Sequence, residues 1–530
     1  MAYDILIQNG TVVDGSGGPR VRADVGVVGG RIVALGDLQG RDAQRVIDAA
    51  GLVVCPGFID IHQHSDFTPL VNRACESAVR QGITTAVIGN CGHGCAPLSD
   101  PDLVRMVVIG YQPEWGVPLD WSSYGEYLER LATPGVAVNL APLVAHGAVR
   151  LAVMGLDARP ASPDELNQMR GLVQEAMEAG AHGLSSGLEY SPGMHADQAE
   201  LTELAKVVAP FGGIYASHIR NRGFTFVEAT QEALGIGEAA GVPVQLSHFA
   251  PRPYAPPGAF EQCLALVYAA RDQGLRVTLD TFPDIFGPGP VAALLPPWIY
   301  EGRPVEGLAR LQDAEVREAI RAAFENPTNY LLRVDGLGGL ILSYSKSHPE
   351  LVGQSFTAIA HLRGQAAHDA ICDLLLAEGE DFYTALLRHI YATDTDLKAL
   401  MRQPICAMES DGIISAPYGP LADFTMNPSS YGYTARVLEQ QVRVEGFYSL
   451  EDAVWRMTGL PAEAANLRER GQLREGWAAD IVVFDPATIR DNTTNDRPNV
   501  YPSGVQYVLV NGQLTLTPEG HSGALGGKVI

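Results

Sequence analysis

The run Gly57-Phe58-Ile59-Asp60-Ile61-His62-Gln63-His64 is an apolar stretch that ends in a His-x-His motif. In a β-strand, residues i and i+2 point to the same face, so the imidazoles of His62 and His64 are predicted to face one cavity. Two neutral ring nitrogens aimed at one point are typical ligands of a divalent metal ion. An isolated His-x-His motif has a plainer alternative, a pair of surface histidines in a strand-to-loop turn, and the rest of the chain decides between the two.

Outward from this motif, strand-like apolar runs alternate with segments of helical periodicity across residues 56–460. Repeated strand–helix alternation predicts a parallel sheet, and eight such units predict a closed (β/α)8 or TIM barrel of the α/β class. The active-site groups of such barrels lie in the loops at the carboxyl ends of the strands. The strand candidates are residues 58–61, 84–88, 137–144, 183–186, 213–216, 243–247, 276–280 and 405–409.

Both chain ends are predicted to be β-rich. Near the start, strand-like runs lie at 5–8, 11–13, 23–28 and 31–35, with Asn9-Gly10 and Gly29-Gly30 between runs. Near the end, runs lie at 479–484 and 505–516, and the second is broken by Asn511-Gly512. These dipeptides are hairpin-turn signals. Because the termini of compact units often lie close together, residues 1–55 and 461–530 are predicted to form one small β-sandwich domain beside the barrel.

Residues 290–404 are longer than one strand–helix unit requires. We therefore expect an inserted helical segment near the barrel mouth. Its place between the seventh and eighth strand candidates predicts that it closes the pocket and selects the acyl or amine group of the substrate.

Composition limits the partners of the chain. The 530 residues carry a net charge of −24, the wrong sign for binding nucleic acid or an anionic membrane. No window is apolar enough for a membrane span, and the start has no basic region leading into an apolar run, so a cytoplasmic protein is expected. Seven cysteines suggest no disulfide framework. Barrels of this size are often homo-oligomers, although no patch in the sequence identifies an interface.

Four further residues of metal-ligand type follow apolar runs: Cys91, His218, His248 and Asp411. Singly, each has an ordinary alternative. His248 fits a hydrogen-bonded core histidine, Cys91 a small buried hydrophobe, and Asp411 with Gly412 a plain turn. Together with the His-x-His motif, however, they place six ligand-type groups at five predicted strand ends, which favours a shared metal centre.

The chemistry of this set predicts metal-assisted hydrolysis. Thiolate and imidazole together favour zinc, and a water on zinc loses a proton near neutral pH. Asp411 can accept that proton and pass it to a leaving amine. The alternative from another class is a catalytically inactive binding protein with the same fold. Such proteins usually lose metal ligands, whereas all six groups are present here.

The same residues stand in longer motifs that resemble one family nearly end to end. The motifs are PGFIDIHQHSD at 56–66, GNCG at 89–92, HGAVRLAVMG at 146–155, GLSSGLEYSPG at 183–193, ASHIRNRG at 216–223, QLSHF at 245–249, ESDG at 409–412 and GWAADIVVFDP at 476–486. Together these motifs resemble the amidohydrolase superfamily, and specifically the N-acyl-D-amino-acid deacylases (D-aminoacylases).

The resemblance implies a hydrolase of a linear amide, the N-acyl group of a D-amino acid or related amine, with a distorted barrel and a small β domain. It implies one zinc ion held tightly by Cys91, His218 and His248. It also implies a second, weaker site at His62, His64 and Asp411, with Asp411 as the catalytic acid and base. Two further residues have both a substrate-binding and a structural interpretation: Tyr190 beside the substrate, and Arg220 beside a ligand.

Three departures from the family bear on the substrate. Ala250 stands where typical members have a lysine, Asn427-Pro428-Ser429 replaces His-Pro-Arg, and Phe282-Pro283-Asp284 replaces Tyr-Pro-Tyr and adds a carboxylate. A free substrate carboxylate therefore fits less well, unless Arg222 or Arg252 supplies the missing cation. A neutral, cationic or larger amide stays open as the substrate, and so does a cyclic amide, formamide, carbamate or lactone.

Overall fold

Eight parallel strands surround the centre of the computed structural model, which describes residues 2–98, 100–105, 107–325 and 336–530. Neighbouring strands pair in parallel, and a parallel bridge between Gln63 and Gly412 joins the last strand to the first. The strands are β6 (Phe58–Asp60), β7 (Ile83–Ile88), β8 (Asn139–Pro142) continued by β9 (Val144–Ala145), β10 (Gly183–Gly187), β11 (Ile214–His218), β12 (Val244–Leu246), β13 (Val277–Thr281) and β17 (Cys406–Met408). The predicted barrel fold is confirmed.

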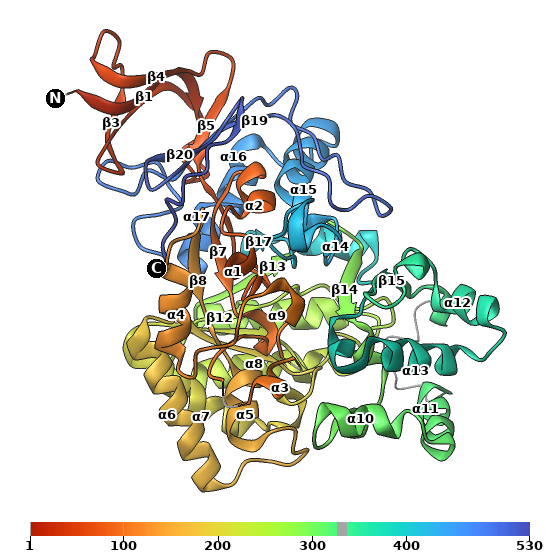
Figure 1. The fold of residues 1–530 in the computed structure, drawn as a ribbon. Coiled ribbons are helices and arrows are strands. Elements are labelled where there is room, and N and C mark those ends of the chain that lie inside the picture. Colours follow the sequence, from red (N-terminus) through yellow and green to blue (C-terminus); the bar gives the residue numbers. More distant parts are fainter. Residues whose placement is uncertain (1, 99, 106, 326–335) are drawn as a thin grey trace.

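Helices pack around the outside of the barrel (Figure 1). Their ends follow from the sequence: α6 starts at Pro163 behind a capping box of Ser162 and Glu165, and it stops at Gly180, whose φ is +115°. The barrel helices are α4 (Tyr124–Ala132), α5 (His146–Met154), α6 (Pro163–Ala179), α7 (Gln198–Val208), α8 (Phe226–Ala240), α9 (Ala259–Asp272), α14 (Asp394–Met401), α15 (Ser429–Arg436), α16 (Leu450–Arg456) and α17 (Gly459–Ala464). Shorter helices are α1 (Thr68–Val71), α2 (Glu76–Arg80) and α3 (Pro101–Val104).

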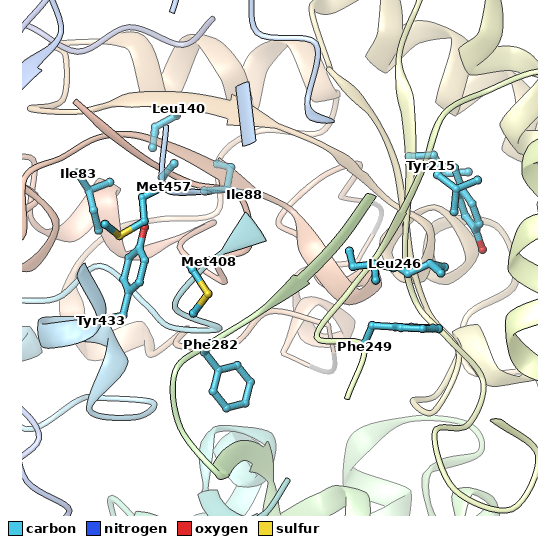
Figure 2. Close-up of a cluster of buried hydrophobic side chains, with 14 of the residues drawn as sticks. Ile83, Ile88, Leu140, Tyr215, Leu246, Phe249, Phe282, Met408, Tyr433 and Met457 are labelled. Carbon is cyan, nitrogen blue, oxygen red and sulfur yellow. The ribbon is translucent and has the colours of Figure 1, made fainter. Parts of the chain in front are cut away.

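The main core lies between the barrel strands and these helices. Figure 2 shows Ile83, Leu140, Leu246 and Met408 among its buried side chains. Strands that are covered on both faces need uncharged, mostly apolar residues at successive positions, and β7 reads Ile-Thr-Thr-Ala-Val-Ile and is buried throughout. Each fully buried leucine or isoleucine stabilises the fold by about 2 kcal/mol.

A nine-stranded sheet from both chain ends forms the second region, at the upper left of Figure 1. The two ends meet where β5 pairs antiparallel with β18, with Val54 opposite Val483. The sheet therefore takes strands from both chain termini. Its strands are β1 (Tyr3–Val12), β2 (Val21–Val28), β3 (Arg31–Gly36), β4 (Ala43–Asp48), β5 (Val53–Pro56), β18 (Ile481–Phe484), β19 (Val505–Val510), β20 (Gln513–Thr517) and β21 (Gly520–His521).

One hairpin expected in this domain is absent from the described residues. Asn9-Gly10 lies inside the single strand β1, where the register to β2 shifts between Ile7 and Gly10. Asn9 adopts a left-handed φ of 63°, and a side chain at Gly10 would meet Val54. The Asn-Gly signal therefore marks a β-bulge in a continuous strand, because the same left-handed conformation serves a turn and a bulge.

The insertion forms a third region, at the lower right of Figure 1 and away from the β domain. The sequence had led us to expect a helical segment, but the insertion also contains strands. Its strands form an antiparallel sheet in the order β14-β16-β15, and its helices pack on a separate apolar core that includes Phe356 and Leu375. The elements are β14 (Phe286–Pro290), α10 (Pro304–Arg310), α11 (Ala314–Glu325), β15 (Ile341–Tyr344), α12 (Phe356–Arg363), α13 (Ala367–Glu378) and β16 (Leu386–Ile390).

In the part of the chain that the structure describes, no helix combines the length and apolar character that crossing a membrane requires. The cysteines are all buried and free of disulfide bonds.

Candidate metal centre

The six predicted ligand residues all lie at the carboxyl ends of barrel strands. His62 and His64 follow β6, Cys91 follows β7, and His218 is the last residue of β11. His248 follows β12, and Asp411 follows β17. Every one of them is buried, with at most 7% of its surface exposed. The structure thus brings together residues that are up to 349 positions apart, as the strand-end argument predicted.

The sulfur of Cys91 is the centre of this group. Its Sγ lies 3.2 Å from His62 Nε2, 3.5 Å from His248 Nε2 and 3.7 Å from His218 Nδ1. Ligands on metal bonds of 2.0–2.3 Å in tetrahedral geometry lie roughly 3.5 Å from one another. The donor atoms therefore have the spacing and the chemical types that a zinc ion requires.

Asp411 closes the opposite side of the cluster. Its Oδ1 lies 3.1 Å from His64 Nε2 and 3.7 Å from His62 Nε2. Within the described ranges, three groups of three residues have donor atoms within 4.8 Å of one another, and one of them is the expected tight site of Cys91, His218 and His248. The other two groups are His62, His64 and Cys91, and His62, His248 and Asp411. The residues of the expected weaker site are thus divided between these two groups.

Strained backbone positions three of these side chains. Cys91, His248 and Asp411 have φ values of 53°, 35° and 42°, in the left-handed region that residues with a side chain seldom adopt. Hydrogen bonds hold the strained turns: Asn427 Nδ2 donates to the backbone oxygen of Asp411 at 2.8 Å, and the backbone N–H of His248 donates to Asp280. Such strain costs on the order of 1–3 kcal/mol per residue and is typical of functional sites.

Cys91 and His62 stabilise charge on each other. Burial opposes charge on both groups, but their mutual attraction, with the polar contacts of His218 and His64 to the sulfur, holds the pKa of Cys91 well below its usual value. The same attraction, aided by Asp280, raises the pKa of His62 well above its usual value. Cys91 is therefore a thiolate, the form that binds metal.

Two neighbouring carboxyl groups differ in protonation. Burial raises the pKa of Asp411, but His64 and His62 outweigh it, so the pKa lies below the usual value and the group is ionised. For Glu409, burial and the charges of Asp280 and Asp411 raise the pKa well above its usual value. Asp411 is therefore the carboxylate available as a base, and Glu409 is the acid beside it.

Of the residues expected to contact substrate, three lie at the cluster. The ring centre of Tyr190 is 4.8 Å from that of His218. Arg222 donates to the backbone oxygen of His248 and lies over the ring of Tyr391 at 4.9 Å. Arg252 is buried and contacts a carboxylate oxygen of Glu189 at 3.2 Å.

The other two expected contacts serve ion pairs instead. Arg220 binds Glu232 and the backbone oxygens of Met194 and Ala196, and a third of its side chain is exposed. Asp284 pairs with Arg436, which also binds Asp491. The negative charge that we expected from Asp284 is therefore partly offset by a cation that Asp284 shares with Asp491.

Sequence reasoning missed the residues that the insertion contributes. Tyr383 Oη lies 3.2 Å from Nε2 of His93, a buried histidine beside His64, and His389 contacts Arg252. Tyr391 Oη accepts from the backbone N–H of Ala250 at 3.2 Å. The alternation of His389 and Tyr391 in an apolar run was the available signal, since residues two apart in a strand share a face.

Comparison with known proteins agrees with this geometry. Residues 45–336 and 347–516 match the amidohydrolase family. The chain is 34% identical over 528 residues to a D-aminoacylase of Alcaligenes xylosoxydans xylosoxydans, covering 100% of this chain and 97% of that protein. It is also 34% identical to an N-acyl-D-glutamate deacylase of the same organism, with 96% and 93% of the two chains covered.

Solved structures show the same relationship. A crystal structure of D-aminoacylase superposes with a TM-score of 0.83 at 32% identity and covers 99% of both chains. The N-acyl-D-glutamate deacylase of Bordetella bronchiseptica, solved with zinc and a phosphonate inhibitor, gives a TM-score of 0.82 at 31% identity, over 100% of this chain and 99% of that one. The chain therefore belongs to the amidohydrolase family and is a hydrolase of amide carbon–nitrogen bonds in its D-aminoacylase branch.

Proposed function

We propose that this protein is a zinc-dependent deacylase that cleaves the linear amide bond of N-acyl-D-amino acids. The observation that carries the proposal is the buried cluster of one thiolate, four imidazoles and one carboxylate at the barrel mouth. The D-aminoacylase and the two N-acyl-D-glutamate deacylases that resemble the chain over nearly its whole length support the same substrate class.

Each ligand has a proposed role. Cys91, His218 and His248 hold a tightly bound zinc ion, since a thiolate with two imidazoles suits zinc. A weaker second site uses His62, His64 and Asp411. That site competes with catalysis, because a carboxylate that coordinates a metal is a weaker base.

The reaction consumes one water and yields a carboxylic acid and an amine. When bound, zinc supplies Lewis acidity that activates water and polarises the amide carbonyl. Asp411 accepts the proton that water loses and delivers it to the amine nitrogen as the carbon–nitrogen bond breaks. His64, at 3.1 Å from Asp411 Oδ1, orients that carboxylate. We assign Tyr190 and Tyr383 to substrate contact, because their rings lie beside His218 and His93.

Arg222 is the residue that we assign to the substrate carboxylate. It is buried, and among the described residues no carboxylate lies within ion-pair distance of it. A buried guanidinium is stabilised by an anionic partner, and a substrate carboxylate supplies one. Arg252, in contrast, already shares its charge with Glu189. Arg220 and Asp284 have no part in the proposal, since both serve ion pairs elsewhere.

A matched substrate panel tests the proposal. Amine release is measured with N-acetyl-D-amino acids, their L-enantiomers, and the same D-compounds with the carboxylate converted to a neutral amide. Zinc content is determined on the same protein batch. We expect release mainly from the free D-acids, and Arg222→Met should raise KM for the acids and leave the neutral amides unaffected. Release only from neutral amides, or none from zinc-loaded protein, would overturn the proposal and direct the search to cyclic amides.

A further inference from the structure

The four histidines of the metal cluster differ in what contacts their outer nitrogens. His218 directs Nδ1 toward Cys91, and its outer nitrogen, the one that faces away from the cluster, is Nε2. This Nε2 lies 2.7 Å from Glu189 Oε2. The outer nitrogens of His64 and His248 have no hydrogen-bond partner within the described ranges. His62 Nδ1 is 3.7 Å from Asp280, beyond hydrogen-bond distance. Glu189 is thus distinguished as a carboxylate bonded to the outer nitrogen of a metal-site histidine.

The carboxylate of Glu189 is itself fixed in place. Its side chain is 2% exposed, and the oxygen that faces His218 is also 3.2 Å from Arg252 Nη2. Arg252 is equally buried and contacts the ring nitrogens of His389 at 3.2 and 3.3 Å. His389 belongs to β16, so the chain of contacts runs from the inserted sheet through Arg252 and Glu189 to His218.

We propose that Glu189 is a positioning residue for the metal centre. By accepting the Nε2 proton of His218, it fixes the tautomer in which the lone pair of His218 lies on Nδ1, the nitrogen directed at Cys91. Arg252 holds the carboxylate at the right place, and His389 holds Arg252. The inference rests on the proposed function in one respect, namely that His218 binds the metal.

The physical reason is general. A histidine has two tautomers, and only the one with a free lone pair on the inner nitrogen binds metal. A carboxylate on the outer N–H selects that tautomer, holds the ring and makes the inner nitrogen more basic, and losing such a partner typically costs 10–100-fold in metal affinity. The contact also links the insertion to the metal centre, because His389 contacts Arg252.

Zinc affinity measured by competition with a chromophoric chelator tests this assignment. Glu189→Gln should weaken zinc binding by about 10–100-fold. In the cobalt-substituted protein, it should also shift the visible absorption bands that report ligand geometry at the metal. The matched control is Glu76→Gln, which removes a buried carboxylate paired with Arg80 on α2, outside the metal cluster. The control should leave both readouts unchanged.

A second variant guards against misfolding. Glu189→Asp keeps the charge beside Arg252 but shortens the side chain by one methylene, so it should lengthen the contact to His218 and weaken zinc binding in the same direction. Circular dichroism establishes which variants fold. Wild-type zinc affinity and an unchanged cobalt spectrum in the folded variants would overturn the role of Glu189. A wild-type protein that binds zinc but releases no amine from the substrate panel would instead overturn the proposed function and leave Glu189 in its role.

Discussion

At the scale of single residues, Cys91 is the central ligand of the proposed metal site, because its sulfur lies within 3.7 Å of three imidazole nitrogens. Cys91→Ala removes the thiolate and should lower zinc affinity by more than about 100-fold, since a ligand contributes more than its outer partner. Cys95→Ala is the control, because Cys95 is a buried thiol outside the ligand groups. Chelator competition measures both variants. Equal zinc affinity in Cys91→Ala and wild type would remove Cys91 from the ligand set.

Tyr383 tests the contribution of the insertion to the reaction. Tyr383→Phe removes the hydroxyl that lies 3.2 Å from His93 Nε2, so we expect kcat/KM to fall about tenfold, which is the order of one lost hydrogen bond. Zinc affinity should not change. Tyr300→Phe removes another buried hydroxyl of the insertion, one that donates to the backbone oxygen of Ala292, and should leave kcat/KM unchanged. Equal kcat/KM for Tyr383→Phe and wild type would place Tyr383 outside the substrate's path.

The ligand residues could be predicted from sequence because each follows an apolar run, and parallel strands bring their ends to one rim. Glu189 could not be assigned in that way. Its neighbour Tyr190 drew attention through its motif, but the partners of Glu189 come from β11, the loop after β12 and the insertion. Contacts of this kind depend on how distant segments pack, and no local pattern in the sequence records them.

At the scale of elements, a buried ion pair anchors α7 to α5. Glu200 contacts Arg150 Nη1 at 2.6 Å and His146 Nε2 at 2.8 Å, and these partners outweigh burial and lower the pKa of Glu200 to about 2. The unfolded carboxyl titrates near pH 4.3. The pair therefore stabilises the fold above about pH 4.3, and its contribution is lost as the pH falls toward about 2.

Glu200→Gln should accordingly lower the free energy of unfolding by about 3 kcal/mol at pH 7, because it leaves Arg150 buried without its carboxylate. The deficit relative to wild type should narrow as the pH falls from 4 toward 2. Glu203→Gln on the same helix breaks an exposed pair with Lys206 and should leave the free energy of unfolding nearly unchanged. Urea unfolding at several pH values checks both, and a deficit that does not vary with pH would contradict the assignment.

The ends of an element could be predicted where a local sequence signal corresponds to a single backbone structure. The capping box at Ser162 and the glycine at 180 mark the two ends of α6 in the sequence. Asn9-Gly10 was interpreted wrongly because a left-handed residue serves a hairpin turn and a bulge alike. The strands of the insertion were missed for another reason: β14 contains two prolines and two glycines, which depress any local strand signal.

At the scale of the whole molecule, the insertion and the barrel meet at the metal centre. Because Tyr383 and His389 contact residues beside the ligands, occupation of the pocket should reduce opening of residues 290–404. Limited proteolysis of zinc-loaded protein should show slower cleavage in the insertion with saturating D-amino acid product than without it. Cleavage elsewhere in the chain is the internal control, and equal cleavage rates in the insertion would argue against closure over the pocket.

The overall arrangement was the most predictable feature. Alternation of strands and helices is compatible with few topologies, and both chain ends contain strand-like runs broken by turn dipeptides. The substrate was the least predictable. The residues that replace the family's lysine and arginine do not identify a substrate by themselves. Only the structure shows that Asp284 pairs with Arg436, whereas no carboxylate of the described residues lies within ion-pair distance of Arg222.

The most direct test of the central claim compares wild type with Asp411→Asn at equal, measured zinc content. Asn has nearly the shape of Asp but cannot accept the proton, so the variant should keep the tightly bound zinc and lose about 100-fold to 10,000-fold in amine release from an N-acetyl-D-amino acid. Amine release by zinc-loaded Asp411→Asn at the wild-type rate would contradict the account, because the hydrolysis would then proceed without Asp411.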